Sequence, residues 1–194
     1  MGVFTRVEWD ALELLKLLNG KGVNYEPVIR GTSRVIITTQ DVAGALSTLP
    51  DAAQAWAFLY ANAQPRPRDF ARVLSPLARL VRDALVRDRM RTKGGRTLDQ
   101  VAHGVARSAL HQSIMGRGEC GRCVGLGVVG DDACMSCEGD GQARVTEQQR
   151  CDWAGLGMSR QAYDKWAPYE ALALAAVAEW VELIRGRLVE LVRS

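Results

Sequence analysis

The chain has 194 residues, of which 47% are hydrophobic and 24% charged, and its net charge is +3. This composition excludes a disordered tail and supplies enough apolar side chains for one domain of ordinary size or two small ones. Acidic residues interrupt the longest apolar stretch before it reaches the ~20 residues that a membrane span needs. The first residues mix charged and apolar side chains, unlike a secretory signal, and we expect a cytoplasmic protein without a membrane partner.

The N-terminal residues are expected to form a helix and a short ribbon. Thr5 and Glu8 have the spacing of a capping box, and leucines then recur at helical intervals until Asn19 and Gly20 end the helix. Residues 20–39 place Gly, Asn and Pro around short β-branched runs. This pattern favours a two-stranded β-ribbon.

Two short helices are predicted next, over residues 41–49 and 51–63. The proline-rich residues 64–67 then break the helical pattern. The second helix is expected to bury its bulkiest side chains, namely Trp56, Phe58 or Leu59, and Tyr60.

Residues 64–97 carry ten Arg or Lys side chains against three Asp. Because proline cannot donate a backbone hydrogen bond, Ser75 and Pro76 predict the N-cap and first position of a new, basic helix. The local positive charge favours binding to a nucleic-acid backbone, and a solvated helix face is the alternative. The candidate backbone contacts are Arg79, Arg82, Arg87, Arg89, Arg91, Lys93 and Arg96.

Thr97 and Gln100 form a further capping box, which opens a helix to about residue 115. His103 and His111 lie on this helix without a metalloprotease motif or neighbouring carboxylates, and we expect them to be structural or surface residues. The sequence also lacks a phosphate-binding loop motif and a serine hydrolase pattern. We therefore expect a protein that is not an enzyme.

The strongest sequence signal is a pair of CxxCxGxG motifs. The first contains Cys120 and Cys123, and the second contains Cys134 and Cys137. Two residues between the cysteines allow one tight turn to direct two thiolates at an ion, and two such turns complete a tetrahedral site. We predict one structural Zn²⁺, with the glycines allowing backbone N–H groups to approach the sulfurs.

Two disulfides are the competing interpretation of these cysteines. A cytoplasmic setting is reducing, the total of five cysteines is odd, and CxxC disulfides are redox-active rather than structural. Four thiolates would also fill the coordination sphere of zinc and leave no position for a substrate. Cys151, the fifth cysteine, is expected to act as a small apolar residue.

The segment after the cysteines has the proportions of a helix-turn-helix. Thr146 and Ser159 have the character of N-caps for two short helices, which are joined by a turn containing Gly157. Tyr163 and Trp166 are expected to face inward. A plain corner between two helices is the alternative. The outward candidates for contacts to DNA bases or phosphates are Arg160, Gln161 and Lys165.

A long helix over residues 169–192 is predicted to complete the chain, with one apolar face formed by Val177, Trp180, Ile184, Leu188 and Leu191. We therefore expect a mostly α-helical protein with three regions: a helical region with a possible ribbon and a basic helix at 1–115, a zinc-binding loop at 116–145, and a helix-turn-helix with the final helix at 146–194. The zinc loop is expected to brace the helix-turn-helix.

Paired CxxCxGxG motifs are similar to the zinc-binding region of DnaJ-type chaperones, but that region has four repeats, and this chain has no J-domain HPD tripeptide. Two repeats followed by the run 157–160, Tyr163 and Trp166 instead resemble the antitermination protein Q family of lambdoid and related bacteriophages. The resemblance covers residues 120–169. It implies that Cys120, Cys123, Cys134 and Cys137 bind zinc and that Arg160, Gln161 and Lys165 contact DNA.

The resemblance also implies a function. Proteins of this family bind double-stranded DNA beside a late promoter, engage bacterial RNA polymerase and its sigma factor, and allow the enzyme to read through terminators. Nascent RNA is a further candidate partner for the basic helix. Two other functions fit the same motifs: a zinc-stabilised chaperone-like or adaptor module that binds proteins, and a zinc-containing transcriptional repressor. DNA binding separates the first from the antiterminator, and terminator read-through separates the second.

Overall fold

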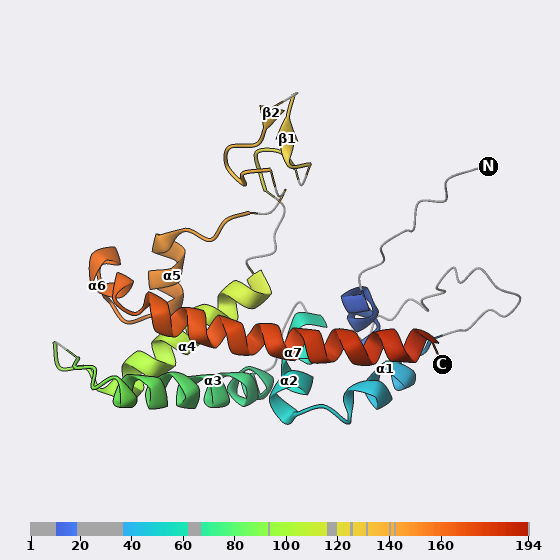
Figure 1. The fold of residues 1–194 in the computed structure, drawn as a ribbon, viewed down its shortest axis with the longest axis horizontal. Coiled ribbons are helices and arrows are strands. Elements are labelled where there is room, and N and C mark those ends of the chain that lie inside the picture. Colours follow the sequence, from blue (N-terminus) through green and yellow to red (C-terminus); the bar gives the residue numbers. More distant parts are fainter. Residues whose placement is uncertain are drawn as a thin grey trace, which may run out of the picture. The chain divides into compact units, whose positions relative to one another are not determined.

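The computed structural model describes residues 11–18, 37–61, 67–92, 94–115, 120–124, 126–130, 132–139, 141 and 143–193. These residues are mostly helical, which confirms the predicted fold class (Figure 1). They fall into two compact units, one of Met1–Arg72 with Glu179–Ser194 and one of Val73–Ala178. Among the described helices, none combines the length and apolarity that crossing a membrane requires. The predicted capping box at Thr5 and nearly all of the predicted ribbon lie outside the described residues.

The first unit begins with a 3₁₀-helix, η1 (Ala11–Leu18), which packs against helices α1 (Thr39–Leu46) and α2 (Asp51–Ala61). Leu12, Leu14 and Leu15 are fully buried, and Leu17 is 5% exposed. The Thr39 hydroxyl donates a hydrogen bond to the Leu17 carbonyl at 3.1 Å, which ties η1 to the start of α1.

The two short helices predicted in this unit are confirmed, although α1 ends at Leu46, earlier than expected. The hydroxyl of Thr38 and the carboxylate of Asp41 form a capping box that sets the start of α1. In α2, Trp56 is fully buried and stacks on Tyr60, with the ring centroids 5.1 Å apart. Leu59 is buried and Phe58 is half-exposed, which decides between the two expected core residues.

The predicted helix start at Ser75 is wrong, because helix α3 runs without a break over Pro67–Arg87 with Pro76 inside it. Proline in a helix interior costs about 3 kcal/mol. However, Val73, Leu77 and Val81 form one buried stripe that continues across the proline. Burying each such side chain contributes about 1.5–3 kcal/mol, which outweighs the lost hydrogen bond.

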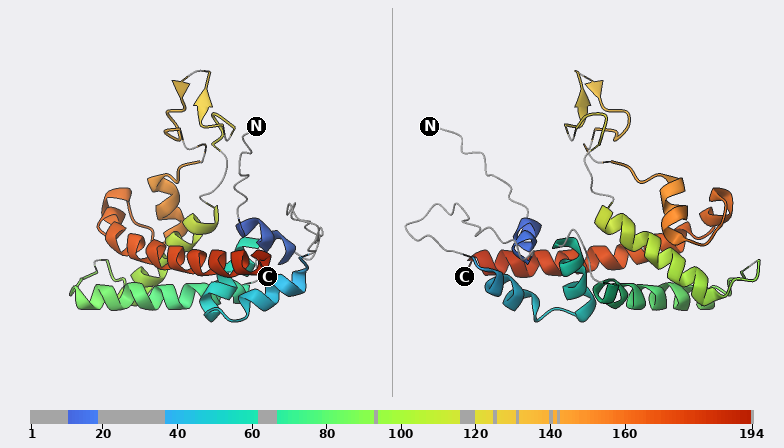
Figure 2. Two further views of the ribbon diagram at one scale, coloured as in Figure 1. Left: turned by 45° about the vertical axis from the view of Figure 1, so that its right-hand side comes forward. Right: turned by 180° about the vertical axis from the view of Figure 1, so that it is seen from behind.

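The second unit contains α4 (Leu98–Met115), α5 (Glu147–Ala154), α6 (Arg160–Asp164) and the start of α7 (Ala167–Arg193). Helix α5 packs against α4, as Figures 1 and 2 show. The reciprocal hydrogen bonds between Thr97 and Gln100 confirm the predicted cap of α4.

Helix α7 differs from its prediction at two points. It begins at Ala167 and includes Pro168, because a proline in the first turn loses no helical hydrogen bond. Its buried stripe also contains Val181, whereas Trp180 is only half-buried. Of the other residues predicted on this face, Val177, Ile184 and Leu188 are buried and Leu191 is half-buried.

Candidate metal centre and nucleic-acid interface

The four cysteines predicted as metal ligands converge on one point. The Sγ atoms of Cys120, Cys123, Cys134 and Cys137 all lie within 4.8 Å of one another, and each residue is at most 4% exposed. The Sγ–Sγ distances are 3.9 Å between Cys120 and Cys134 and 3.7 Å between Cys123 and Cys137. Tetrahedral zinc with Zn–S bonds of about 2.3 Å holds its sulfurs roughly 3.8 Å apart. The cluster therefore has the dimensions of a four-thiolate metal site.

Each CxxCxGxG motif folds into a turn that points backbone donors at sulfur. The N–H of Gly127 donates to the Cys123 Sγ at 3.3 Å, and the N–H of Gly141 donates to the Cys137 Sγ at the same distance. The predicted role of the glycines is thus confirmed at the last glycine of each motif. Such hydrogen bonds disperse the negative charge of thiolates.

The two motifs also bind each other through equivalent backbone hydrogen bonds. The N–H of Cys120 donates to the carbonyl of Gly141 at 2.8 Å, and the N–H of Cys134 donates to the carbonyl of Gly127 at 2.8 Å. Gly127 has φ +75°, and a Cβ there would lie 2.3 Å from the carbonyl oxygen of Gly139. A glycine is therefore required where the two turns meet.

A two-stranded hairpin connects the two turns. Its strands are β1 (Val128–Val129) and β2 (Asp132–Ala133), which pair antiparallel with Val128 opposite Ala133 (Figures 1 and 2). Gly130 lies between the strands with φ +66°, a conformation that suits a tight hairpin turn.

The thiols of the cluster differ in acidity. Burial raises the pKa of Cys123 to about 11. Burial also acts to raise the pKa of Cys134, but hydrogen bonds from the backbone N–H groups of Ser136 and Cys137 and from neighbouring thiols lower it to about 7. A bound cation would hold all four groups as thiolates, so its binding releases protons and weakens as the pH falls.

The cysteine loop, residues 120–141, has its apolar side chains on the outside. The four cysteines form a buried cluster of their own. Five of the eight large hydrophobic residues that are exposed in the described part of the chain lie on this loop, between 45% and 84% exposed: Val124, Leu126, Val128, Val129 and Met135. The loop thus exposes apolar surface, and its buried cluster is formed by the four cysteines.

The segment after the loop has the predicted caps. Thr146 forms a capping box with Gln149 at the start of α5, and Gly155, with φ +62°, ends that helix. The Ser159 hydroxyl accepts a hydrogen bond from the backbone of α6. Helix α6 has only five residues, and Tyr163 is buried as expected. The reading of this segment as a DNA-binding helix-turn-helix stays a prediction.

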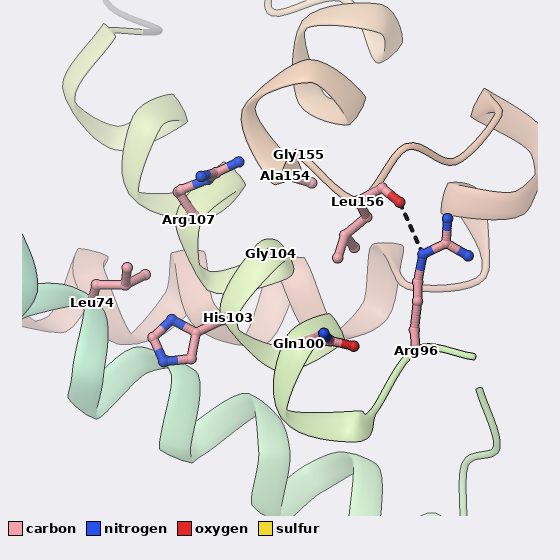
Figure 3. Close-up of a pocket in the computed structure, with 9 residues that line it drawn as sticks. All are labelled: Leu74, Arg96, Gln100, His103, Gly104, Arg107, Ala154, Gly155 and Leu156. Atoms are coloured by element: carbon pink, nitrogen blue, oxygen red, sulfur yellow. Dashed lines mark hydrogen bonds between the residues drawn. The ribbon is translucent and has the colours of Figure 1, made fainter. Parts of the chain in front are cut away.

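The turn between α5 and α6 is fixed by α4 and the residues just before it, a feature that the sequence analysis missed (Figure 3). The Arg96 Nε donates to the Leu156 carbonyl at 2.9 Å, and the Arg107 Nε donates to the Trp153 carbonyl at 2.6 Å. A Cβ on Gly104 would lie 2.6 Å from the Leu156 side chain, so α4 makes room for that leucine. Glycine inside a helical pattern was the available signal for this close approach.

A buried ion pair, also missed from sequence, joins α5 to the start of α7. Glu170 is 2% exposed and accepts hydrogen bonds from the Arg150 guanidinium at 2.6 Å and the Tyr163 hydroxyl at 2.8 Å. Burial, together with the Glu170 carboxylate, raises the pKa of Tyr163. In the sequence, Glu170 is visible only as a charge that interrupts an apolar stretch.

The side chains predicted to contact DNA bases are on the surface. Arg160, Gln161 and Lys165 are all exposed on α6 or directly after it. The Lys165 ammonium lies 4.1 Å from the centroid of the Trp166 ring, and the Trp166 side chain is fully buried. These positions leave the three predicted side chains accessible to a ligand.

The predicted backbone contacts on and after α3 lie in different surroundings. Arg82 pairs with Asp99 at 2.7 Å and Arg87 pairs with Asp88 at 3.2 Å. Exposed pairs of this kind contribute little to stability. Arg79, Arg89 and Arg91 are exposed, Arg96 is half-buried and binds the α5–α6 turn, and Lys93 lies outside the described residues.

The two histidines on α4 have separate roles. His111 stacks on Trp153 with the ring centroids 5.7 Å apart, and burial, followed by the charge of Arg107, lowers its pKa. His103 is exposed.

Comparisons with protein-family models, with curated proteins and with solved structures find no significant match for this chain.

Proposed function

We propose that this protein is a zinc-binding, DNA-binding transcription antitermination factor similar to the phage Q proteins. Three observations support the proposal: a preformed four-cysteine cluster, a capped α5–α6 segment with exposed polar side chains, and the pattern of motifs that these two features share with that family. The observation that carries it is the cysteine cluster immediately before the α5–α6 segment.

Zinc is the proposed metal because four buried cysteine Sγ atoms lie within 4.8 Å of one another, close enough to bind one ion together. Zn²⁺ takes four such ligands in structural sites, and no coordination position would remain for a substrate. We expect about one zinc per chain in protein purified under reducing conditions, measured by elemental analysis. If elemental analysis finds no metal in folded, reduced protein, the proposed zinc site is rejected.

The proposed DNA contacts are Arg160, Gln161 and Lys165. They extend from a segment whose preceding turn is held by Arg96 and by Arg107 of α4. A turn fixed in this way would present these side chains in a constant geometry, as base reading requires. Basic residues on α3 would add salt-dependent contacts to phosphates. The exposed apolar side chains of the cysteine loop would be available to RNA polymerase or its sigma factor.

DNA binding is tested with a duplex that the wild-type protein selects from a random pool. Arg160→Ala should weaken binding to this duplex by about 1–3 kcal/mol if the side chain reads a base edge. Arg187→Ala is the matched control, since Arg187 is an exposed arginine on α7 that pairs with Glu190. Equal affinities of the two variants for the duplex would indicate that the α5–α6 segment is a corner between two helices that does not read DNA bases.

Antitermination itself is tested with purified RNA polymerase on a template that carries a promoter followed by a terminator. Added protein should increase the fraction of transcripts that extend beyond the terminator. A decrease in initiation without read-through would instead identify the repressor that the sequence also allows.

The exposed apolar side chains of the cysteine loop favour a second candidate, an adaptor that binds protein through this loop. Met135 is 84% exposed, which makes Met135→Ser a direct probe of such a surface. In the adaptor, this substitution would weaken partner binding and the α5–α6 segment would bind no duplex. In the antiterminator, duplex binding would be retained in Met135→Ser while read-through falls.

A further inference from the structure

A pocket of about 420 Å³ lies beside the turn that follows α5 (Figure 3). Its volume is within the range of ligand pockets, roughly 300–1,000 Å³. The polar side chains that line it are Arg96, Gln100, His103 and Arg107. All belong to the second unit, and three of them lie on successive turns of α4.

The lining of this pocket is positively charged. Arg96 and Arg107 carry permanent charges, and none of the described residues that line the pocket is acidic. Asp99, the acidic neighbour of Gln100 on α4, pairs with Arg82 at 2.7 Å. The charge of Arg107 also contributes to the lowered pKa of His111 nearby. An anion would therefore find a favourable potential here.

Several hydrogen-bond donors of the pocket are unused. Arg107 donates through Nε to Trp153, and its two terminal nitrogens have no partner among the described residues. Arg96 donates through Nε and Nη2 to the turn, which leaves Nη1. The Gln100 Oε1 accepts from the Thr97 N–H, so the amide nitrogen of that side chain remains a donor.

We propose that this pocket binds a phosphate group, with Arg96 and Arg107 as its cationic contacts and Gln100 and His103 as further hydrogen-bond donors. The planar guanidinium of arginine matches phosphate oxygens, and here its Nε edge is already fixed on backbone carbonyls. The phosphate belongs either to a free nucleotide or to the backbone of DNA, and the second source rests on the proposed function.

The sharpest probe is Gln100→Glu, because the capping box prefers glutamate at this position and the side-chain acceptor for the Thr97 N–H is kept. The substitution places one negative charge in the lining and should weaken phosphate binding roughly tenfold. Gln149→Glu is the matched control, since Gln149 occupies the same position in the capping box of Thr146 and does not line the pocket.

Three probes are titrated against the metal-loaded full chain and both variants: inorganic phosphate, AMP and a DNA duplex of arbitrary sequence. Backbone contacts do not depend on sequence, so this duplex tests the pocket separately from base reading by α6. Binding is followed by amide chemical shifts for the small ligands and by fluorescence anisotropy for the duplex.

Loss of inorganic phosphate or AMP binding in Gln100→Glu alone supports a free-phosphate site. Weaker binding of the duplex by Gln100→Glu alone supports a contact with the DNA backbone, provided that the slope of log affinity against log salt concentration also falls by about 1. Equal behaviour of Gln100→Glu and Gln149→Glu toward all three probes would overturn the inference. A further outcome is that Gln100→Glu weakens duplex binding while Arg160→Ala leaves binding to the selected duplex unchanged. That result would support the phosphate site in the pocket and reject the proposed DNA contacts of α6.

Discussion

The cysteine loop and the α5–α6 turn both depend on positive-φ glycines, but they are held by different forces. In the loop, the four cysteines are the buried cluster and the large apolar side chains are exposed. At the turn, Arg96 donates to the Leu156 carbonyl, Arg107 donates to a carbonyl in the last turn of α5, and Leu156 packs on Gly104. A segment without an apolar interior needs a ligand to order it, whereas a segment packed against a helix is ordered by the chain itself.

The largest effect is expected from metal removal. Structural zinc contributes an apparent free energy of about 10–16 kcal/mol to small four-ligand sites, so chelation of the proposed zinc should unfold the cysteine loop. The α5–α6 turn should stay folded, because its contacts come from Arg96 and from α4, in contrast to the bracing by the zinc loop that the sequence led us to expect. Amide hydrogen exchange measures both regions in one experiment. Loss of protection from exchange in α5 upon chelation would show that the metal orders this helix as well as the cysteine loop.

The next effect tests the packing of the helical region at its buried ion pair. Glu170→Gln leaves the Arg150 guanidinium without its carboxylate and should lower the free energy of unfolding by about 3 kcal/mol. Denaturant titration gives this value. Glu190→Gln, which breaks an exposed pair with Arg187, should change stability by less than about 1 kcal/mol. Similar losses in the two variants would mean that burial of Glu170 has no energetic consequence.

A smaller effect is expected at the cap of α5. Gly155 has φ +62°, and a Cβ there would lie 1.8 Å from the Arg107 guanidinium, so Gly155→Ala should destabilise the chain by about 1–2 kcal/mol. Gly186→Ala in α7 has open space around it and should stabilise the chain by up to about 1 kcal/mol. Thermal unfolding of both variants reports the difference. Shifts of the midpoint in the same direction would show that the positive φ of Gly155 and its contact with Arg107 do not matter for stability.

The smallest effect on stability belongs to the apolar exterior of the cysteine loop. Met135→Ser should change the free energy of unfolding of the metal-loaded protein by no more than about 0.5 kcal/mol, since the side chain is 84% exposed. Leu156→Ser in the turn removes a half-buried side chain that packs on Gly104, and should destabilise more. A large loss in Met135→Ser would reveal an apolar contact that helps to fold the loop.

Much of the local structure follows from sequence patterns. The caps at Thr97, Thr146 and Ser159 are set by hydrogen bonds within one helical turn, so they are readable from three or four residues. The cysteine cluster is equally readable, because the geometry of tetrahedral metal binding dictates the CxxC spacing and the glycines beside it.

Tertiary packing decided the features that the sequence patterns left open or misjudged. Pro76 ends a helix by local rules, yet burial of Val73 and Leu77 carries α3 across it. The contacts of Arg96 and Arg107 with the α5–α6 turn join residues that are 46 to 61 positions apart. Local hydrogen-bonding rules act within a few residues, whereas burial and long-range hydrogen bonds depend on which helices the fold brings together.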